Sequence, residues 1–399
     1  MSEWKKVKLG EITESCLGKM LDAAKNRGEY KPYLANLNVR WGCFDTDNLS
    51  LMKFEEDEDE RYGIKYGDLI ICEGGEPGRC AIWKEEIPDM KIQKALHRVR
   101  PKKGLVDNFY LFYWFLLAGK RNLIDQYCTG ATIKHLPGQK LKEVVVDLPP
   151  LATQHYIATI LSRYDSLIEN YQKQIKLLEE AAQRLYKEWF VDLHFPGHEN
   201  TKIVDGVPEG WEKKKIWNFV ELQSGYAFKS STFEDGCPYK IVTIKNVKDG
   251  VFEGENVSTV RTVPEKMPNH CFLKDGDILL SLTGNVGRVC MVIGENYLLN
   301  QRVAKLKTKY PAYTYTLFRS HDMFITVCNL ANGAAQQNVS PIRIGDIDIV
   351  MANDELMNKF EGRAGVYIDE IIKHHRQIRL LTEARDRLLP KLMSGEIAV

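Results

Sequence analysis

The side chains of this sequence best suited to bind a ligand are basic and amide residues gathered in a few short segments. Lys and Arg neutralise phosphate groups, while Arg, Lys, Asn and Gln form hydrogen bonds with the edges of nucleic-acid bases. In the first half of the chain the candidates are Arg79, Lys94, His97, Arg98, Arg100, Lys134 and His135. In the second half they are Arg288, Arg302, Lys305, Lys307, Gln336, Gln337 and Asn338. Their types make nucleic-acid contact one hypothesis for this chain.

An internal repeat must position these residues. In both GDLIICEGGEPGRC (from Gly67) and GDILLSLTGNVGRV (from Gly276), a Gly-Asp pair leads into an apolar run, a Gly-rich loop and a Gly-Arg pair, at an offset of 276 − 67 = 209. WKKVKLGEITESCLG matches WEKKKIWNFVELQSG at 211 − 4 = 207, and GATIKHL matches GAAQQNV at 333 − 130 = 203. The differences among these offsets, from 203 to 209, require only short insertions in loops. The chain is therefore a tandem duplication of a unit about half its length.

Composition excludes several classes of protein. The 399 residues suffice for two or three domains, and the nine cysteines show no CxxC spacing. There is no N-terminal apolar signal region and no apolar run of about 18 residues. We therefore expect a reducing, cytoplasmic protein without membrane segments. Because 55 basic residues balance 54 acidic ones, giving a formal charge of +1, any surface that attracts nucleic acid must be local.

Each half divides into two segments of different periodicity. Short β-rich runs broken by Gly, Pro and Asn, together with one apolar helical stretch, predict an α+β globular domain over residues 1–150. A helix is expected to follow over residues 151–195, after Pro149-Pro150. The second half repeats this order, with a second globular domain over 196–350 and a second helix over 351–399.

The two predicted helices carry heptad repeats of apolar residues. In the first helix, apolar or aromatic residues recur from Ile157 to Trp189 at spacings that alternate between four and three residues. The second repeats the pattern from Phe360 to Leu392, interrupted only by His374 and Arg385. Such heptads predict a coiled coil in which the helices bury their apolar faces against each other. The expected contact residues are Ile168, Ile175, Leu178, Leu185, Ile371, Ile378, Leu381 and Leu388.

The direction of helix pairing determines what the domains can do together. Both parallel and antiparallel pairing are open to a chain of this order. Antiparallel pairing relates the two halves by a pseudo-twofold axis, which suits a DNA site made of two half-sites at a fixed separation. We therefore expect an antiparallel coiled coil between two similar globular domains.

The order of domain, helix, domain and helix resembles the DNA-specificity subunit of type I restriction-modification systems. WKKVKLGEI, GATIKHLPGQKLKEVVVDLPPLATQ, the segment from LIENYQKQ to HFPGHEN, VPEGWEKKKIW and LLPKLMSGEI carry the resemblance, which covers essentially the whole chain. It implies a host-defence protein in which the two globular domains are target-recognition domains, each of which reads one half of a bipartite double-stranded DNA site. It also implies that the helices set the spacing and dock two methyltransferase subunits, with motor-nuclease restriction subunits joining them.

The motifs expected of catalysis are missing from the sequence. Adenine methyltransferases hold the flipped base with an Asn/Asp-Pro-Pro-aromatic loop. The nearest stretch, DLPPL, inserts Leu148 after Asp147 and has Leu151 in place of the aromatic residue. There is no GxxxxGK[ST] phosphate loop. His194 and His198 lack cysteine partners nearby, so we expect no metal. We therefore expect no enzyme activity and no cofactor in this chain; S-adenosylmethionine, ATP and Mg would belong to the partner subunits.

Several alternatives stay open on the sequence alone. Arg79 and Arg288 recur in both halves, and domains that read different half-sites should not share base readers, so a structural turn or a phosphate contact is favoured for this pair. The basic residues of KALHRVR and RVAKLK alternate as on a half-buried strand and can equally be its solvated face. Rival functions are a diverged DNA methyltransferase and an interaction scaffold that no longer reads DNA.

Overall fold

The computed structural model describes residues 4–22, 26–130, 132–255, 257–331 and 338–397. It forms two compact units, one made of residues 1–167 with 381–399 and the other of residues 168–380. Each unit therefore combines one globular α+β domain with parts of both long helices. This partition differs from the four successive segments predicted at 1–150, 151–195, 196–350 and 351–399, because the packed helix segments belong to the cores of the domains.

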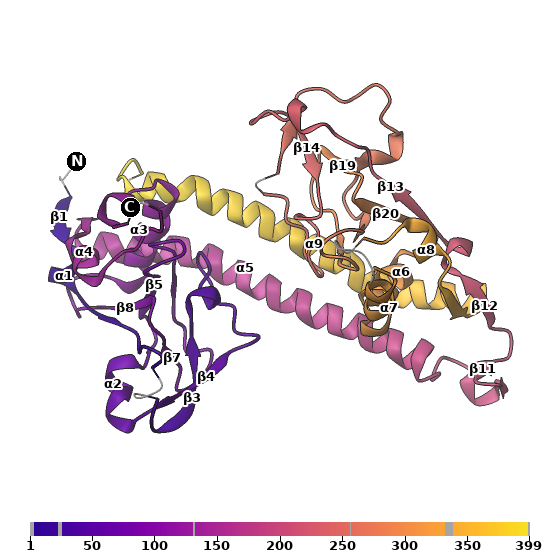
Figure 1. Cartoon of the computed structure of the whole chain (residues 1–399), viewed down its shortest axis with the longest axis horizontal. Coiled ribbons are helices and arrows are strands. Elements are labelled where there is room, and N and C mark those ends of the chain that lie inside the picture. Colours follow the sequence, from indigo (N-terminus) through magenta and orange to yellow (C-terminus); the bar gives the residue numbers. More distant parts are fainter. Residues whose placement is uncertain (1–3, 23–25, 131, 256, 332–337, 398–399) are drawn as a thin grey trace. The chain divides into compact units, whose positions relative to one another are not determined.

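The first unit is built around a four-stranded antiparallel sheet with the strand order β2-β8-β5-β6. A three-stranded sheet, β4-β3-β7, and a two-stranded sheet, β1-β9, complete it. Figure 1 labels most of these strands. Their bounds are β1 Lys5–Lys8, β2 Thr13–Leu17, β3 Glu29–Leu34, β4 Ser50–Phe54, β5 Leu69–Cys72, β6 Cys80–Ile82, β7 Lys91–Ile92, β8 Leu96–Pro101 and β9 Val145–Leu148.

Helices of the first unit follow the apolar pattern of the sequence. The run NFYLFYWFLLAGK forms α3 (Asn108–Lys120), and Tyr110 through Leu116 are buried in it, because the run is apolar on every side. Asp107 caps this helix by accepting a hydrogen bond from the backbone N–H of Tyr110 at 2.8 Å. The shorter helices are α1 Leu9–Ile12, α2 Asp59–Tyr62 and α4 Gly138–Glu143.

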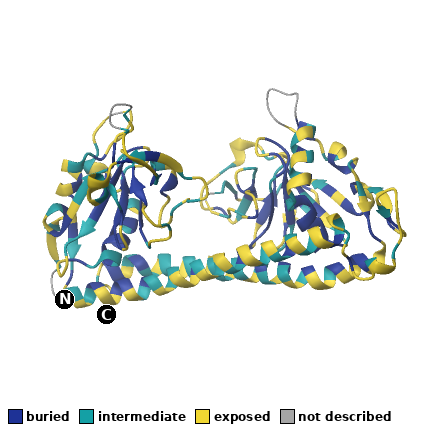
Figure 2. Cartoon of the chain, turned by 90° about the horizontal axis from the view of Figure 1, so that it is seen from below, coloured by how far each residue is buried: buried dark blue, intermediate teal, exposed yellow. Residues whose placement is uncertain are grey.

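The second unit repeats this plan. Its main sheet has the order β13-β20-β17-β18, its second sheet is β15-β14-β19-β16, and β12 pairs with β21 as β1 pairs with β9. The inner strands β5 and β17 are buried apolar runs, and Figure 2 shows dark blue ribbons inside both domains. The strands are β10 Ile203–Val204, β11 Val207–Pro208, β12 Glu212–Lys215, β13 Val220–Ser224, β14 Tyr239–Val242, β15 Thr259–Val260, β16 Phe272–Leu273, β17 Ile278–Ser281, β18 Val289–Met291, β19 Tyr297–Leu299, β20 Val303–Thr308 and β21 Asp348–Met351. The helices before β21 are α6 Pro311–Arg319, α7 His321–Ala331 and α8 Pro341–Gly345.

The two long helices are α5 (Leu151–Tyr186), which continues as a π-helix over Lys187–Val191, and α9 (Asp354–Met393). In the first unit, Ile157 near the start of α5 shares a core with Leu389 near the end of α9. In the second unit, Ile175 near the end of α5 shares a core with Phe360 near the start of α9. The helices therefore pair antiparallel.

Burial along the helices follows the heptad repeat. The expected contact residues Ile168, Ile175 and Ile371 are buried, and Leu178 and Leu185 are half-buried. Ile378, Leu381 and Leu388 of α9 are half-buried as well. At the interruption of the repeat, the ring of His374 lies against that of Tyr171, with centroids 4.9 Å apart.

Candidate nucleic-acid interface

The repeated Gly-Asp pair forms a tight turn before β5 in the first unit and before β17 in the second. Gly67 and Gly276 have φ angles of 84° and 87°, a backbone conformation that glycine adopts without strain. The carboxylate of Asp68 accepts a hydrogen bond from the N–H of Lys65 at 2.8 Å, and that of Asp277 accepts one from the N–H of Lys274 at 2.7 Å. The geometry of this turn therefore explains why the Gly-Asp pair occurs in both halves of the chain.

Two candidate cations complete these turns. Arg100 of β8 donates two hydrogen bonds to the carboxylate of Asp68, at 2.7 and 2.6 Å. Lys305 of β20 forms an ion pair with Asp277 at 2.7 Å, and both side chains are about 15% exposed. These two basic residues hold strands together within their own units.

The structure places His97 and Arg98, two of the predicted DNA contacts, in the interior of the first unit. Both side chains are buried, and Arg98 donates hydrogen bonds to the carbonyl oxygens of Glu60 and Gly63 at 2.9 and 2.8 Å. The Nε2 atom of His97 lies 2.9 Å from the carbonyl oxygen of Leu136, and burial lowers the pKa of this imidazole. Groups with such internal partners have no access to a ligand in solvent.

A glycine loop follows β5 in the first unit, at residues 73–78, and β17 in the second, at residues 282–287. It closes when the N–H of Gly78 donates to the carbonyl of Cys72, and that of Gly287 to the carbonyl of Ser281, each at 3.0 Å. The φ angles of Gly78 and Gly287 are 89° and 81°. The Gly-rich stretches of the repeat therefore form the same loop twice.

The arginine after each glycine loop takes a different role in each unit. Arg79 is 15% exposed and donates to the carbonyl oxygen of Asn36 at 2.9 Å, while Nη1 lies 3.2 Å from Glu76. Arg288 is 42% exposed, and its guanidinium lies 4.9 Å from the ring centroid of Phe324. Arg79 is therefore a structural residue, whereas Arg288 remains available at the surface.

The glycine loop is joined to two further segments, a basic turn and a helix-entry loop. The basic turn comprises residues 93–95 in the first unit and 300–302 in the second. The helix-entry loop comprises, among the described residues, 129–130 and 132–136 in the first unit and 338–339 in the second. The N–H of Glu73 donates to Ala95 at 2.8 Å, and its carbonyl accepts from Leu136 at 2.7 Å. The N–H of Leu282 likewise donates to Arg302 at 3.0 Å, and its carbonyl accepts from Val339 at 2.9 Å.

These three segments bring together part of the predicted set. In the first unit, Lys94, Lys134 and His135 are exposed on them. Lys134 forms an ion pair with Asp125 at 2.6 Å, and a Cβ atom on Gly74 would lie 3.1 Å from Nδ1 of His135. Among the residues that the structure describes, none is hydrogen bonded to the side chain of Lys94.

In the second unit, Arg302 is exposed on the basic turn. The hydroxyl of Thr283 donates to the side-chain oxygen of Asn338 at 2.8 Å, across the glycine loop and the helix-entry loop. Lys307 lies at the far end of β20 and pairs with Glu221 at 3.0 Å. Gln336 and Gln337 lie outside the described residues.

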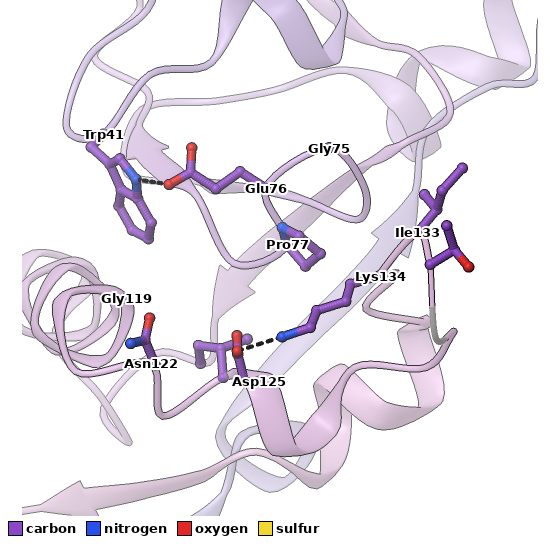
Figure 3. Close-up of a pocket in the computed structure, with 11 residues that line it drawn as sticks. Trp41, Gly75, Glu76, Pro77, Gly119, Asn122, Asp125, Ile133 and Lys134 are labelled. Carbon is purple, nitrogen blue, oxygen red and sulfur yellow. Dashed lines mark hydrogen bonds and ion pairs between the residues drawn. The ribbon is translucent and has the colours of Figure 1, made fainter. Parts of the chain in front are cut away.

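A pocket of about 510 Å³ opens beside the glycine loop and the helix-entry loop of the first unit (Figure 3). Trp41, Asn122 and Asp125 line it, and none of them was a sequence candidate. The sequence does carry a signal for Trp41. NVRWGCF (38–44) matches NVKDGVF (246–252) except at a few positions, and Trp41 occupies one of the positions at which the two halves differ.

Among the described residues, no cluster of His, Cys, Asp and Glu side chains is placed to hold a metal ion. Within the same residues, no helix is both long and apolar enough to cross a membrane.

Comparisons with known proteins agree with the repeat. The family model for the type I restriction modification DNA specificity domain matches residues 1–180 and 208–350. The chain is 27% identical over 348 residues to the type I restriction enzyme MjaIX specificity subunit of Methanocaldococcus jannaschii, covering 84% of this chain and 78% of that one. It is also 27% identical over 418 residues to the MjaVIII specificity subunit of the same organism, covering 100% and 93% of the two chains.

A solved structure shares the fold. The S subunit of a type I restriction-modification system from M. genitalium superposes with a TM-score of 0.57 at 17% identity, over 98% of this chain and 96% of that one. The family model covers most of the sequence and both of its halves. The chain therefore belongs to the family of type I restriction modification DNA specificity domains.

Proposed function

We propose that this chain is the DNA-specificity subunit of a type I restriction-modification complex. Each globular domain reads one half of a bipartite double-stranded DNA site through its glycine loop, basic turn and helix-entry loop. The antiparallel helices set the distance between the half-sites and dock two methyltransferase subunits, which motor-nuclease subunits join. The chain itself is non-catalytic, and S-adenosylmethionine, ATP and Mg act in the partner subunits.

One observation carries this proposal beyond family membership. In both units a single residue, Glu73 or Leu282, joins the glycine loop to the basic turn and to the helix-entry loop through backbone hydrogen bonds. The backbone framework is therefore the same, while the exposed side chains around it differ between the units. Two readers that share a scaffold but recognise different half-sites require this combination.

Selection of bound duplexes from a random DNA pool tests the function. The full chain is incubated with the pool, and the bound fraction is amplified and sequenced over several rounds. We expect a single motif of two short half-sites with a fixed gap. Enrichment of one contiguous motif would limit reading to one domain, and no enrichment at any salt concentration would overturn the proposal in favour of an interaction scaffold.

A further inference from the structure

We propose that the first domain reads its half-site with the side chains that line the pocket beside its glycine loop, namely Trp41, Glu76, Asn122, Asp125 and Lys134. The ligand is the edge of a base that carries an exocyclic amino group, as adenine and cytosine do. This assignment rests on the proposed function, because it names which residues of that surface determine the sequence read.

The pocket is formed by segments that are far apart in the sequence (Figure 3). Trp41 donates a hydrogen bond from Nε1 to the carboxylate of Glu76 at 2.6 Å, which fixes the indole beside the glycine loop. On the other side, the ammonium of Lys134 lies 2.6 Å from the carboxylate of Asp125. The pocket therefore lies between two polar pairs, and both pairs are held by internal contacts.

The lining side chains are accessible as well as ordered. Trp41 is 37% exposed, and the side chains of Glu76, Asp125 and Lys134 are 53%, 51% and 52% exposed. The indole lies against α3, where a Cβ atom on Gly119 would come within 2.1 Å of it. Glycine at this position therefore leaves room for the Trp41 ring.

Comparison of the two units separates scaffold residues from reading residues. In NVRWGCF and NVKDGVF, Asn38 and Asn246 accept the same kind of hydrogen bond from the backbone three residues earlier, at 2.9 and 2.8 Å. Gly42 and Gly250 both have positive φ angles, of 84° and 75°. The residue before each glycine differs in kind, being Trp41 in one unit and an aspartate in the other.

The same contrast holds in the glycine loop. Gly75 and Gly284 have φ angles of 73° and 71°, so the backbone of the loop is the same in both units. The next residue is Glu76 in the first unit and Asn285 in the second. Since a shared scaffold explains what the units have in common, the differing polar residues are the ones that can give two domains different sequence preferences.

The chemistry of the lining favours a base edge over a phosphate. Two carboxylates, of Glu76 and Asp125, would repel a phosphate group, and each has lone pairs beyond those used by its internal partner. Carboxylates accept hydrogen bonds from the amino group of cytosine, and Asn pairs with adenine through two hydrogen bonds. Asn122, which also lines the pocket, supplies such an amide.

Variants of pocket residues in the full chain test this assignment. Asp125→Ala removes a carboxylate, and Asn122→Gly removes the amide while keeping a residue that tolerates the φ angle of 54° found there. Asn285→Ala is the mirror variant in the second glycine loop. Lys65→Ala is the control, because it removes a charge at the opposite end of β5 from the glycine loop.

The readout is the motif obtained by duplex selection with each protein. We expect Asp125→Ala and Asn122→Gly to lower discrimination about tenfold at one or more positions of one half-site, and to leave the other half-site unchanged. Asn285→Ala should lower discrimination only in the other half-site, and Lys65→Ala should leave discrimination unchanged in both. If wild type selects a split motif and both pocket variants select the same motif unaltered, the assignment is wrong. If wild type selects no motif, the proposed function itself fails.

Discussion

The guanidinium of Arg100 binds the carboxylate of Asp68 through two hydrogen bonds of 2.7 and 2.6 Å, and Asp68 is only 2% exposed. In the second unit the same turn is completed by Lys305 and Asp277. A residue that the sequence offers as a DNA contact is thus occupied in joining β8 to the turn before β5. The repeat keeps the carboxylate, whereas the cation comes from a different position of the strand, because Lys305 lies opposite Leu279 as Arg98 lies opposite Ile70.

Asp68→Ala is expected to destabilise the first unit by about 2 kcal/mol, because it leaves the partly buried Arg100 and the N–H of Lys65 without their acceptor. The free energy of unfolding in urea measures this loss. Glu143→Ala is the matched control, since its pair with Lys140 is half exposed on both sides and should contribute less than about 1 kcal/mol. Equal effects of the two substitutions would contradict a structural role for Asp68.

The stability of the second unit should fall as the solution is acidified below about pH 6.5. Burial, with a smaller contribution from neighbouring His374, lowers the pKa of His375 to about 4. An unfolded histidine titrates near 6.5, so between about pH 6.5 and 4 the unfolded chain binds a proton that the folded chain does not, which favours unfolding. His375→Gln should flatten the fall in unfolding free energy measured from pH 7 to 5. An unchanged slope would show that His375 does not titrate in this way.

Exposed cations of the basic turns should contribute salt-dependent affinity for DNA. Lys94→Ala and Arg302→Ala are each expected to weaken binding to all duplexes and to lower the slope of log K against log salt concentration by about one. Fluorescence anisotropy over a salt series measures the slope. Lys65→Ala serves as the control because it lies away from the glycine loop. If both variants kept the salt dependence of the unsubstituted chain, the basic turns would not contribute phosphate contacts.

Lengthening both helices should widen the gap between the half-sites. Seven residues inserted between Leu167 and Ile168 of α5, and seven between Leu380 and Leu381 of α9, fall at the boundary of the two compact units and leave the contacts within each unit intact. Seven helical residues add about 10 Å, which corresponds to about three base pairs of DNA. Duplex selection should return the same half-sites with a longer gap. The original gap would refute the role of the helices in spacing, and an insertion in α5 alone should only destabilise the pairing.

The family, the duplication and the long helices could be predicted because each depends on local patterns. Hydrophobic periodicity specifies which face of a helix is buried, and the residues expected at the heptad positions of α5 are buried or half-buried. The buried helix α3 follows from its uninterrupted apolar run in the same way. The predicted segments differ from the compact units because sequence order does not reveal that each domain packs on parts of both helices.

Residue type and spacing along the chain are enough to show that two copies of one scaffold carry basic and amide residues at equivalent loops. Which of these residues remain available depends on the folded structure. His97 is bound to the carbonyl of Leu136, and Arg98 to carbonyls 35 and 38 residues away, whereas Lys94 and Arg302 stay exposed. The reason is physical: a buried cation or imidazole must find hydrogen-bond partners, and those partners come from segments that only folding brings near.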